Sequence, residues 1–284
     1  MPSNGETMSR GAFPAALAAA IGLTVLSYSV HAQTAGGFAI EVPHVRNYVA
    51  LGAGVVPDYL GSNEYTAGVG PAGLIHLGSD SERYLKVLAT EVSVNVLNDK
   101  SWSLGPVLNY RFGRDHHVQD NVVEHMREID NTVEAGAFVS WKVVSDADPR
   151  LRLAVSLDFL QDVGGEHDGY LVTAAVRYFR PIGRAFTLSA GLATTYGSQG
   201  YTSTYFGVDG RDAAKTGLSK FKADAGFRDV RMNVSGIVSF SPHWHLGAGV
   251  IYSRLIGDAA DSPVVEDRGS PDQFYGFVGL AYAW

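Results

Sequence analysis

The chain contains many short segments in which apolar and polar residues alternate with a period of two. In residues 151–159, Leu, Leu, Val, Leu and Phe occupy one face, and Arg152, Ala154, Ser156 and Asp158 occupy the other. This alternation predicts a β-strand with one apolar and one polar face. Comparable segments cover residues 102–113, 133–143, 170–178, 186–196, 230–240 and 244–252. Each is close to the roughly 9 to 11 residues that a tilted strand needs to cross a bilayer.

Two all-β folds have strands of this kind. A soluble β-sandwich would bury the apolar face in its core, whereas an outer-membrane barrel would turn the same face toward lipid. Aromatic residues stand at the ends of the apolar stripes, where interfacial girdles lie in a barrel; these are Trp102, Phe112, Trp141, Trp244 and Tyr252. The sequence therefore favours a transmembrane, antiparallel outer-membrane β-barrel.

The segments between the predicted strands alternate in length. Short connections at residues 98–101, 145–150, 181–184 and 241–242 alternate with longer ones at 115–130, 163–169, 197–226 and 255–272. Outer-membrane barrels have short periplasmic turns and long extracellular loops. This pattern predicts which end of each strand faces the periplasm.

Residues 274–284 form the last predicted strand, which would run toward the periplasm. Leu280, Tyr282 and Trp284 share its apolar face, with the Trp at the periplasmic interface. This alternating aromatic end resembles the C-terminal signal that the outer-membrane assembly machinery recognises. We expect the strand to pair with the first strand and close the barrel.

The alternation leaves the number of strands open between ten and twelve. Counting back from the end gives ten, with the first at about residues 65–77 and the second at about 83–97. Residues 33–64 include another strand-like stretch, NYVALGAGVV. Because bacterial single-chain barrels have an even number of strands, we expect this region to add two strands or none. The expected barrel covers 65–284, and 33–64 is periplasmic, lumenal or a pair of extra strands.

The N-terminal region has the pattern of a cleaved secretory signal peptide spanning residues 1–32. Residues 11–30 carry no charge, follow Arg10, and place Val30 and Ala32 at the small-residue positions before a cleavage site. The alternative is an uncleaved anchor, which Pro14 and Gly22 weaken. The chain has no cysteine, which excludes disulfides and thiolate chemistry. A net charge of −7 without any Lys/Arg run argues against nucleic acid.

The polar faces of the predicted strands carry charges of both signs. We expect Arg111, Glu134, Asp158 and Arg231 to line the lumen near its extracellular end, and Lys142, Arg152 and Arg177 to line it nearer the periplasm. Arg111 and Glu134 should form a cross-strand ion pair. These charges either fill a narrow barrel in pairs or line a path for small solutes.

Three further patterns have simpler structural explanations. His117, Asp120, Glu124 and His125 could share a helical face and bind a divalent metal, but an amphipathic loop helix explains them equally. His245 and Ser253 fall on the predicted lumen face and would be the residues of an outer-membrane Ser/His lipid hydrolase, the less favoured alternative, yet no GxSxG accompanies them. GVGPAG (68–73) lacks the βαβ context of a dinucleotide site. We therefore expect no catalytic, cofactor or metal site.

Several stretches resemble the MipA/OmpV family of MltA-interacting outer-membrane proteins. They are PDYLGSNEY (57–65), LGPVLNYRFGRD (104–115), IDNTVEAGAF (129–138), YFGVDGRDAAKTGLSKFKADAGFRD (205–229) and RLIGDAADSPVV (254–265). The resemblance implies a non-enzymatic outer-membrane scaffold or adaptor for murein maintenance, whose partners would be a lytic transglycosylase and a penicillin-binding protein. Other members look porin-like, so a narrow channel is the alternative. We expect a monomer that contacts outer-membrane lipid.

Overall fold

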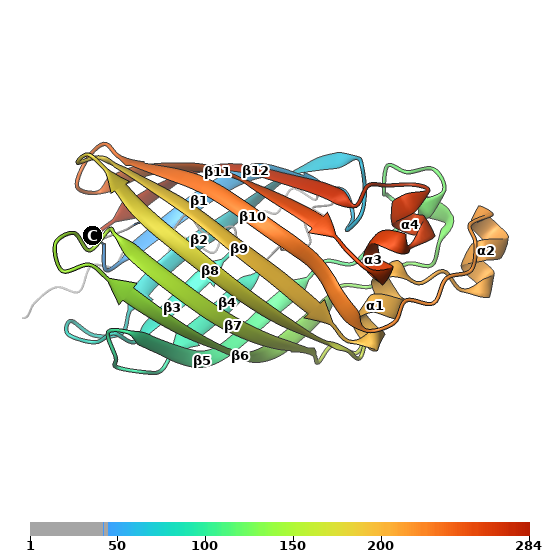
Figure 1. Cartoon of the computed structure of the whole chain (residues 1–284), viewed down its shortest axis with the longest axis horizontal. Coiled ribbons are helices and arrows are strands. Elements are labelled where there is room, and N and C mark those ends of the chain that lie inside the picture. Colours follow the sequence, from blue (N-terminus) through green and yellow to red (C-terminus); the bar gives the residue numbers. More distant parts are fainter. Residues whose placement is uncertain (1–41, 43–44) are drawn as a thin grey trace, which may run out of the picture.

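The computed structural model describes Val42 and residues 45–284, which form a closed antiparallel β-barrel of twelve strands (Figure 1). Neighbouring strands follow chain order around the barrel, and β12 pairs with β1 to close it. The strands are β1 (Tyr48–Pro57), β2 (Tyr65–His76), β3 (Tyr84–Leu88), β4 (Glu91–Asn95), β5 (Trp102–Arg111), β6 (Thr132–Val144), β7 (Arg152–Asp162), β8 (Tyr170–Ile182), β9 (Phe186–Gly197), β10 (Gly226–Ser239), β11 (Trp244–Leu255) and β12 (Asp272–Ala283). The predicted fold is confirmed.

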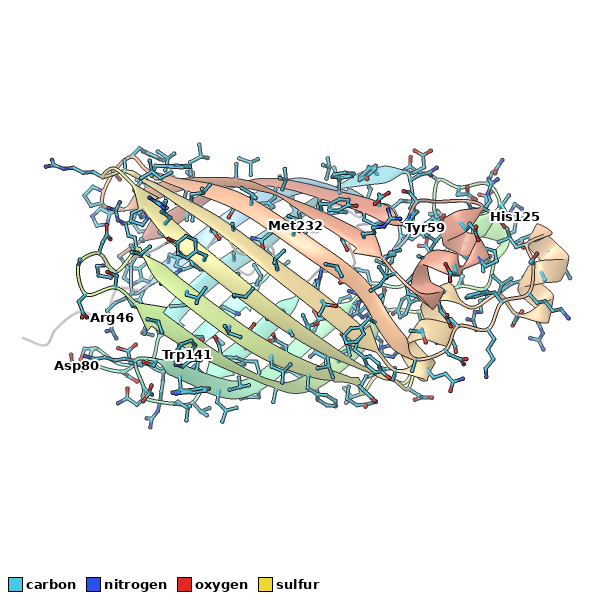
Figure 2. All side chains as sticks on the ribbon, viewed as in Figure 1. Arg46, Tyr59, Asp80, His125, Trp141 and Met232 are labelled. Atoms are coloured by element: carbon cyan, nitrogen blue, oxygen red, sulfur yellow. The ribbon has the colours of Figure 1, made fainter. Side chains whose placement is uncertain are left out.

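The alternation of the sequence becomes the alternation of the barrel wall. On β5, even-numbered residues such as Leu104 and Leu108 are exposed on the outside, whereas Val107 and Asn109 are buried inside. Figure 2 shows Trp141 and Met232 on the outer surface of the wall. The apolar outer belt would face lipid, and the strands pair with their neighbours around the barrel, although the short β3–β4 hairpin pairs with only part of β2 and of β5.

The twelve strands arise differently from the expectation. Residues 33–64 contribute one strand, β1, rather than two or none. The second additional strand comes from residues 83–97, which form the short hairpin β3–β4 instead of one strand. Its turn lies at Ala89, which has a left-handed φ of 51°. The turn shifts the phase of the alternation, so that Lys86 and Leu88 face the lumen before it and Glu91 and Ser93 face the lumen after it.

All helices lie at one end of the barrel, beyond the ends of the strands (Figure 1). They are η1 (Val123–His125), α1 (Gln199–Phe206), α2 (Gly210–Thr216), α3 (Asp258–Asp261) and α4 (Pro263–Glu266). All of them belong to the long connections, which the sequence assigns to the extracellular side. The opposite end has the short connections, and the C-terminus lies there. We call the helical end, including residues 58–64, 112–131, 198–225 and 256–271, the cap.

The closing strand is held along its whole length. β12 pairs with β1 from Tyr48↔Ala283 to Val55↔Gly276, and Trp284 N–H donates to Asn47 O at 3.1 Å. Tyr282 lies against Trp244 (5.1 Å between ring centroids) and Trp284 (6.4 Å), and all three are on the outer surface. This end is therefore fixed by backbone bonds and by aromatic contacts.

The predicted signal peptide, residues 1–32, lies outside the described residues. Within the described part of the chain, no helix is long and apolar enough to cross a membrane.

Candidate functional site

The extracellular half of the lumen contains a buried ion pair between β5 and β6. Arg111 Nε donates to Glu134 Oε1 at 2.7 Å and Arg111 Nη2 donates to Oε2 at 2.9 Å. Asn109 Nδ2 donates to Oε2 at 2.8 Å, and the His167 ring nitrogen lies 3.2 Å from Oε1. The Glu134 carboxylate thus has four polar contacts, and its residue is fully buried. The sequence predicted the Arg111–Glu134 pair, and the structure contains it.

A second charge cluster lies on β10. Asp229 is 2.6 Å from Arg228 Nε and 3.0 Å from Arg231 Nε, while Arg231 Nη2 donates to Thr195 Oγ1 at 2.6 Å. The register of β10 against β9 shifts between Phe227 and Asp229, which indicates a β-bulge. The bulge buries Arg228 and Asp229 together, although strict alternation would turn Arg228 outward.

Two tyrosines of α1 connect the two clusters. The Arg111 guanidinium lies over the rings of Tyr201 and Tyr205, at 5.3 and 5.9 Å from their centroids. Arg228 Nη1 donates to the Tyr201 hydroxyl at 2.6 Å, and His167 meets the Tyr201 ring edge-on at 5.3 Å. The sequence pattern did not identify His167, Tyr201 and Arg228. His167 and Tyr201 lie in connections and Arg228 lies at a β-bulge, where the residues do not alternate regularly between two faces.

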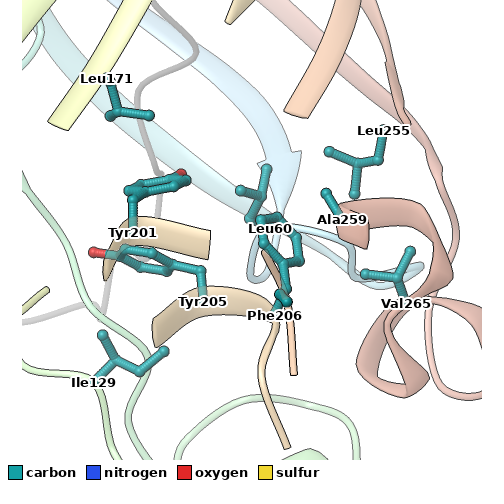
Figure 3. Packing of buried hydrophobic residues seen from close by; sticks show 10 residues of the cluster. Leu60, Ile129, Leu171, Tyr201, Tyr205, Phe206, Leu255, Ala259 and Val265 are labelled. Atoms are coloured by element: carbon teal, nitrogen blue, oxygen red, sulfur yellow. The ribbon is translucent and has the colours of Figure 1, made fainter. Parts of the chain in front are cut away.

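The apolar core of the cap lies directly above these charges. Figure 3 shows Tyr201, Tyr205 and Phe206 of α1 among side chains from several other parts of the chain. Tyr201 and Phe206 have no exposed surface. The surrounding members of this cluster are Leu60, Ile129, Leu171, Ala223, Leu255, Ala259 and Val265. Four of the eight residues of α1 are buried in this way, so α1 covers the extracellular end of the lumen.

The middle of the lumen carries a looser set of charges. Lys86 Nζ lies 3.9 Å from Glu91 Oε1, and these side chains are 28% and 19% exposed. Asp158 experiences the charges of Glu91, Lys86 and Arg177, so all four groups occupy one region. The long distance and partial exposure show that these charges interact with each other without close packing.

The periplasmic part of the lumen has fewer opposite charges. The Arg152 guanidinium stacks over the Phe179 ring at 4.1 Å, and Lys142 is half-buried at the lower end of β6. His245 shares a 2.8 Å hydrogen bond with Ser239 Oγ. Ser253, the residue considered together with His245, lies opposite Arg231 in the register of β11 against β10, at the other end of β11. The structure therefore keeps His245 and Ser253 apart.

Asp120, one of the four residues considered for a metal, makes several contacts within the cap. Asp120 accepts the N–H groups of Val122 and Val123 and pairs with Arg268 at 2.9 Å. Burial acts to raise the pKa of Asp120, but these contacts outweigh it and hold the pKa below its usual value. No cluster of three potential metal ligands occurs among the residues that the structure describes.

A shallow cleft of about 590 Å³ lies on the outer surface of the cap, between His116, Glu124, His125 and Lys215. Its side chains are mostly engaged with their own segment: the His116 ring nitrogen contacts the Glu124 carbonyl at 2.5 Å, and His125 lies 3.7 Å from the Glu124 carboxylate. The cleft is open and is lined by charged groups of both signs, Glu124 and Lys215.

The barrel and its cap match one family model over residues 49–284, described as MltA-interacting protein MipA. The chain belongs to this family. No curated protein matches it. Among solved structures, it is similar to the NanC porin (11% identity, TM-score 0.46, covering 83% of this chain and all of that one). It is also similar to the KdgM porin (12% identity, TM-score 0.38, covering 84% of this chain and 99% of that one). A third similar structure is the translocator domain of the autotransporter NalP from Neisseria meningitidis (13% identity, TM-score 0.41, covering 84% of this chain and 88% of that one).

Proposed function

We propose that this MipA-family barrel is a non-enzymatic scaffold or adaptor of the outer membrane that serves murein maintenance. The observation that carries the proposal is the closed extracellular end: α1 fills the lumen with fully buried Tyr201 and Phe206, and the charges below it are paired. A barrel closed in this way is suited to holding partners rather than passing solutes. The family description names MltA as a partner.

The periplasmic end is the surface that a murein enzyme could reach. Figure 2 places Arg46 and Asp80 there, at the end opposite the cap residue His125. Leu77 and Phe240 add exposed apolar surface in the turns after β2 and β10, at 50% and 59% exposure. Exposed apolar side chains among charged turns are typical of the composition of a protein-binding surface.

The test is capture of a lytic transglycosylase from detergent extracts of the cell envelope, with the full barrel as bait. We expect capture by the native barrel, and weaker capture by the double substitution Leu77→Ser and Phe240→Ser. The matched control is Lys220→Glu with Lys222→Glu, two exposed cap residues whose substitution should leave capture unchanged. A native barrel that retains neither a transglycosylase nor a penicillin-binding protein would contradict the proposal.

A narrow channel is the second candidate, and the part-exposed charges of the middle lumen favour it. Lys86, Glu91, Asp158 and Arg177 would offer a solute both signs of charge, provided that α1 could leave the lumen. In planar bilayers we expect no discrete conductance steps from the native barrel. We expect steps from the triple variant Tyr201→Ala, Tyr205→Ala, Phe206→Ala. Steps from the native barrel would favour the channel instead.

A further inference from the structure

Arg114, in the cap segment that follows β5, is a buried arginine without a carboxylate partner. Its residue is 3% exposed. The other buried or half-buried arginines described in the cap and upper lumen pair with an acid: Arg111 with Glu134, Arg228 and Arg231 with Asp229, and Arg268 with Asp120. None of the ion pairs between described residues includes Arg114. Its charge is therefore the one in this region that the protein leaves uncompensated.

The nitrogen atoms of Arg114 also lack hydrogen-bond partners. Among the described residues, Nε and Nη2 have none. Its backbone is fully used, because Arg114 N–H and O both pair with Ile129 at 2.8 Å, which fixes the root of the side chain. Burial of the guanidinium away from water lowers the pKa of Arg114 to about 10. A guanidinium with that pKa still carries its proton at neutral pH.

Two tyrosines near Arg114 have buried hydroxyls: that of Tyr205 has no hydrogen-bond partner among the described residues, and that of Tyr59 has only the Ser62 hydroxyl beside it. The Arg114 guanidinium lies 5.9 Å from the centre of the Tyr59 ring, and Tyr205 is electrostatically coupled to it. Figure 3 shows that the hydroxyl of Tyr205 is at the opposite end from that of Tyr201, on the side of Ile129. Burial raises the pKa of both Tyr59 and Tyr205, so both hydroxyls stay protonated and able to donate.

Asp212, a neighbouring acid, is already paired with Arg127. It accepts Arg127 N–H at 2.8 Å through Oδ1, while its Oδ2 lies 3.6 Å from Arg127 Nε and is buried without a hydrogen bond. Arg127 also donates to the carbonyl groups of Ser203 and Thr204. The Arg127–Asp212 pair is neutral overall, which leaves the positive charge of Arg114. Two guanidinium nitrogens of Arg114 and the Tyr205 hydroxyl lack acceptors, against this one unpaired carboxylate oxygen, so donors remain in excess.

We propose that Arg114, Tyr59 and Tyr205 form a binding site for a small monovalent anion, such as a halide, inside the extracellular cap. An anion there would accept hydrogen bonds from the guanidinium and from the hydroxyls, and it would neutralise a charge whose burial alone is costly. The three residues come from the β1–β2 connection, the β5–β6 connection and α1. The bound anion therefore ties together three separate segments of the cap and holds α1 in the lumen.

The direct test uses bromide as the probe, because its anomalous scattering locates it. Crystals of the native barrel grown in sodium bromide should give an anomalous peak within about 3.5 Å of Arg114 Nε or Nη2, a hydrogen-bonding distance for so large an ion. The variant Arg114→Met, which replaces the charge with an apolar chain, should lose this peak. The matched control Arg268→Met removes a cap arginine that has its own carboxylate, and it should keep the peak. No peak in the native crystals would overturn the proposal.

A second measurement gives its decisive result on the native barrel alone. The heat-induced unfolding of the native barrel is followed by gel mobility in sodium chloride and in sodium gluconate at equal ionic strength. Mass action predicts that an anion at about 100 times its Kd lowers the unfolding equilibrium constant about 100-fold. The Arg114→Met barrel should unfold alike in both salts. Equal unfolding of the native barrel in both salts would mean that ordered water, rather than an anion, satisfies these groups.

Discussion

The two halves of the lumen hold similar kinds of charged residues in different ways. In the extracellular half, Arg111 and Glu134 are fully buried and joined by two short hydrogen bonds, and α1 covers them. In the middle, Lys86 and Glu91 are partly exposed and 3.9 Å apart. Charges that a protein buries must be paired and hydrogen-bonded, whereas charges that stay hydrated need not be. The charges of the barrel are thus closely paired and covered under the cap, and more loosely arranged below it.

The largest expected effect concerns the periplasmic end of β12, where this strand pairs with β1 and completes the barrel wall. Deleting Tyr282 to Trp284 removes the β12 backbone that pairs with Tyr48 and Val49, and it removes two large outer side chains. Backbone groups left unpaired at membrane depth cost several kcal/mol each. We expect the truncated chain to be degraded in the periplasm and to lose heat-modifiable gel mobility. Trp284→Phe keeps a ring at the interface and should assemble normally; failure of both variants alike would contradict a role in closure.

The second prediction separates the two halves of the lumen directly. Glu134→Ala leaves Arg111 buried and unpaired, so the free energy of unfolding should fall by about 3 to 5 kcal/mol. Removing both charges with Glu134→Ala and Arg111→Met should cost less than Glu134→Ala alone. The matched change in the middle lumen, Glu91→Ala, should cost about 1 kcal/mol or less, because its pair is partly exposed. Thermal unfolding of the purified barrels measures all three, and equal costs for the two single variants would remove the contrast.

The third prediction is that acid loosens the cap before it affects the barrel wall. The pKa of Asp120 and that of Asp209, which caps α2, lie below the usual carboxyl value of 3.8 in the folded protein. For Asp209, the N–H groups of Asp212 and Arg211 lower it most directly. Their stabilisation is therefore complete above about pH 4 and disappears as the pH falls through the lower folded-state value. The protection of the backbone amides in residues 112–131 and 199–225 against hydrogen exchange, relative to the intrinsic rate at each pH, should fall at pH 3 compared with pH 6.

Asp120→Asn serves as the control for the acid effect, since an amide cannot titrate. In this variant, the protection of residues 112–131 relative to the intrinsic exchange rate should already be low at pH 6 and should change little at pH 3. The protection of the wall strands should be the same at both pH values. Acid-induced exchange that begins in the strands, with the cap still protected, would reverse the order of stability.

The smallest expected effect is a single cut in the cap. Lys220 and Lys222 lie on the exposed connection between α2 and β10, so trypsin added to intact cells should cleave there. The barrel should keep its heat-modifiable mobility, because the strands and most of the cap core remain in place. The turn at 145–150 should stay intact in these cells. Cleavage that requires a permeabilised outer membrane would place the cap in the periplasm and invert the orientation.

The sequence by itself determined the barrel and much of the lumen lining. Strand alternation reports which side chains share a face, and this local property alone assigned Arg111, Glu134, Asp158 and Arg231 to the inner face of the wall. The same logic identified the closing strand with Leu280, Tyr282 and Trp284 on its outer face. Loop lengths predict the orientation of the barrel, because outer-membrane barrels have short periplasmic turns and long extracellular loops.

Tertiary structure decided the strand count, the sealing of the lumen and the place of Arg114. The alternation of lumen-facing and outward-facing residues changes phase at Ala89, where a two-residue turn separates β3 from β4. From the sequence alone, such a turn cannot be told apart from an irregularity within one longer strand. The bulge at Phe227 turned Arg228 inward against its period. Tyr201, Tyr205 and Arg114 belong to connections without periodicity, and their burial depends on contacts among segments far apart in the chain. Such contacts are chosen by packing in three dimensions, which a pattern along one chain does not contain.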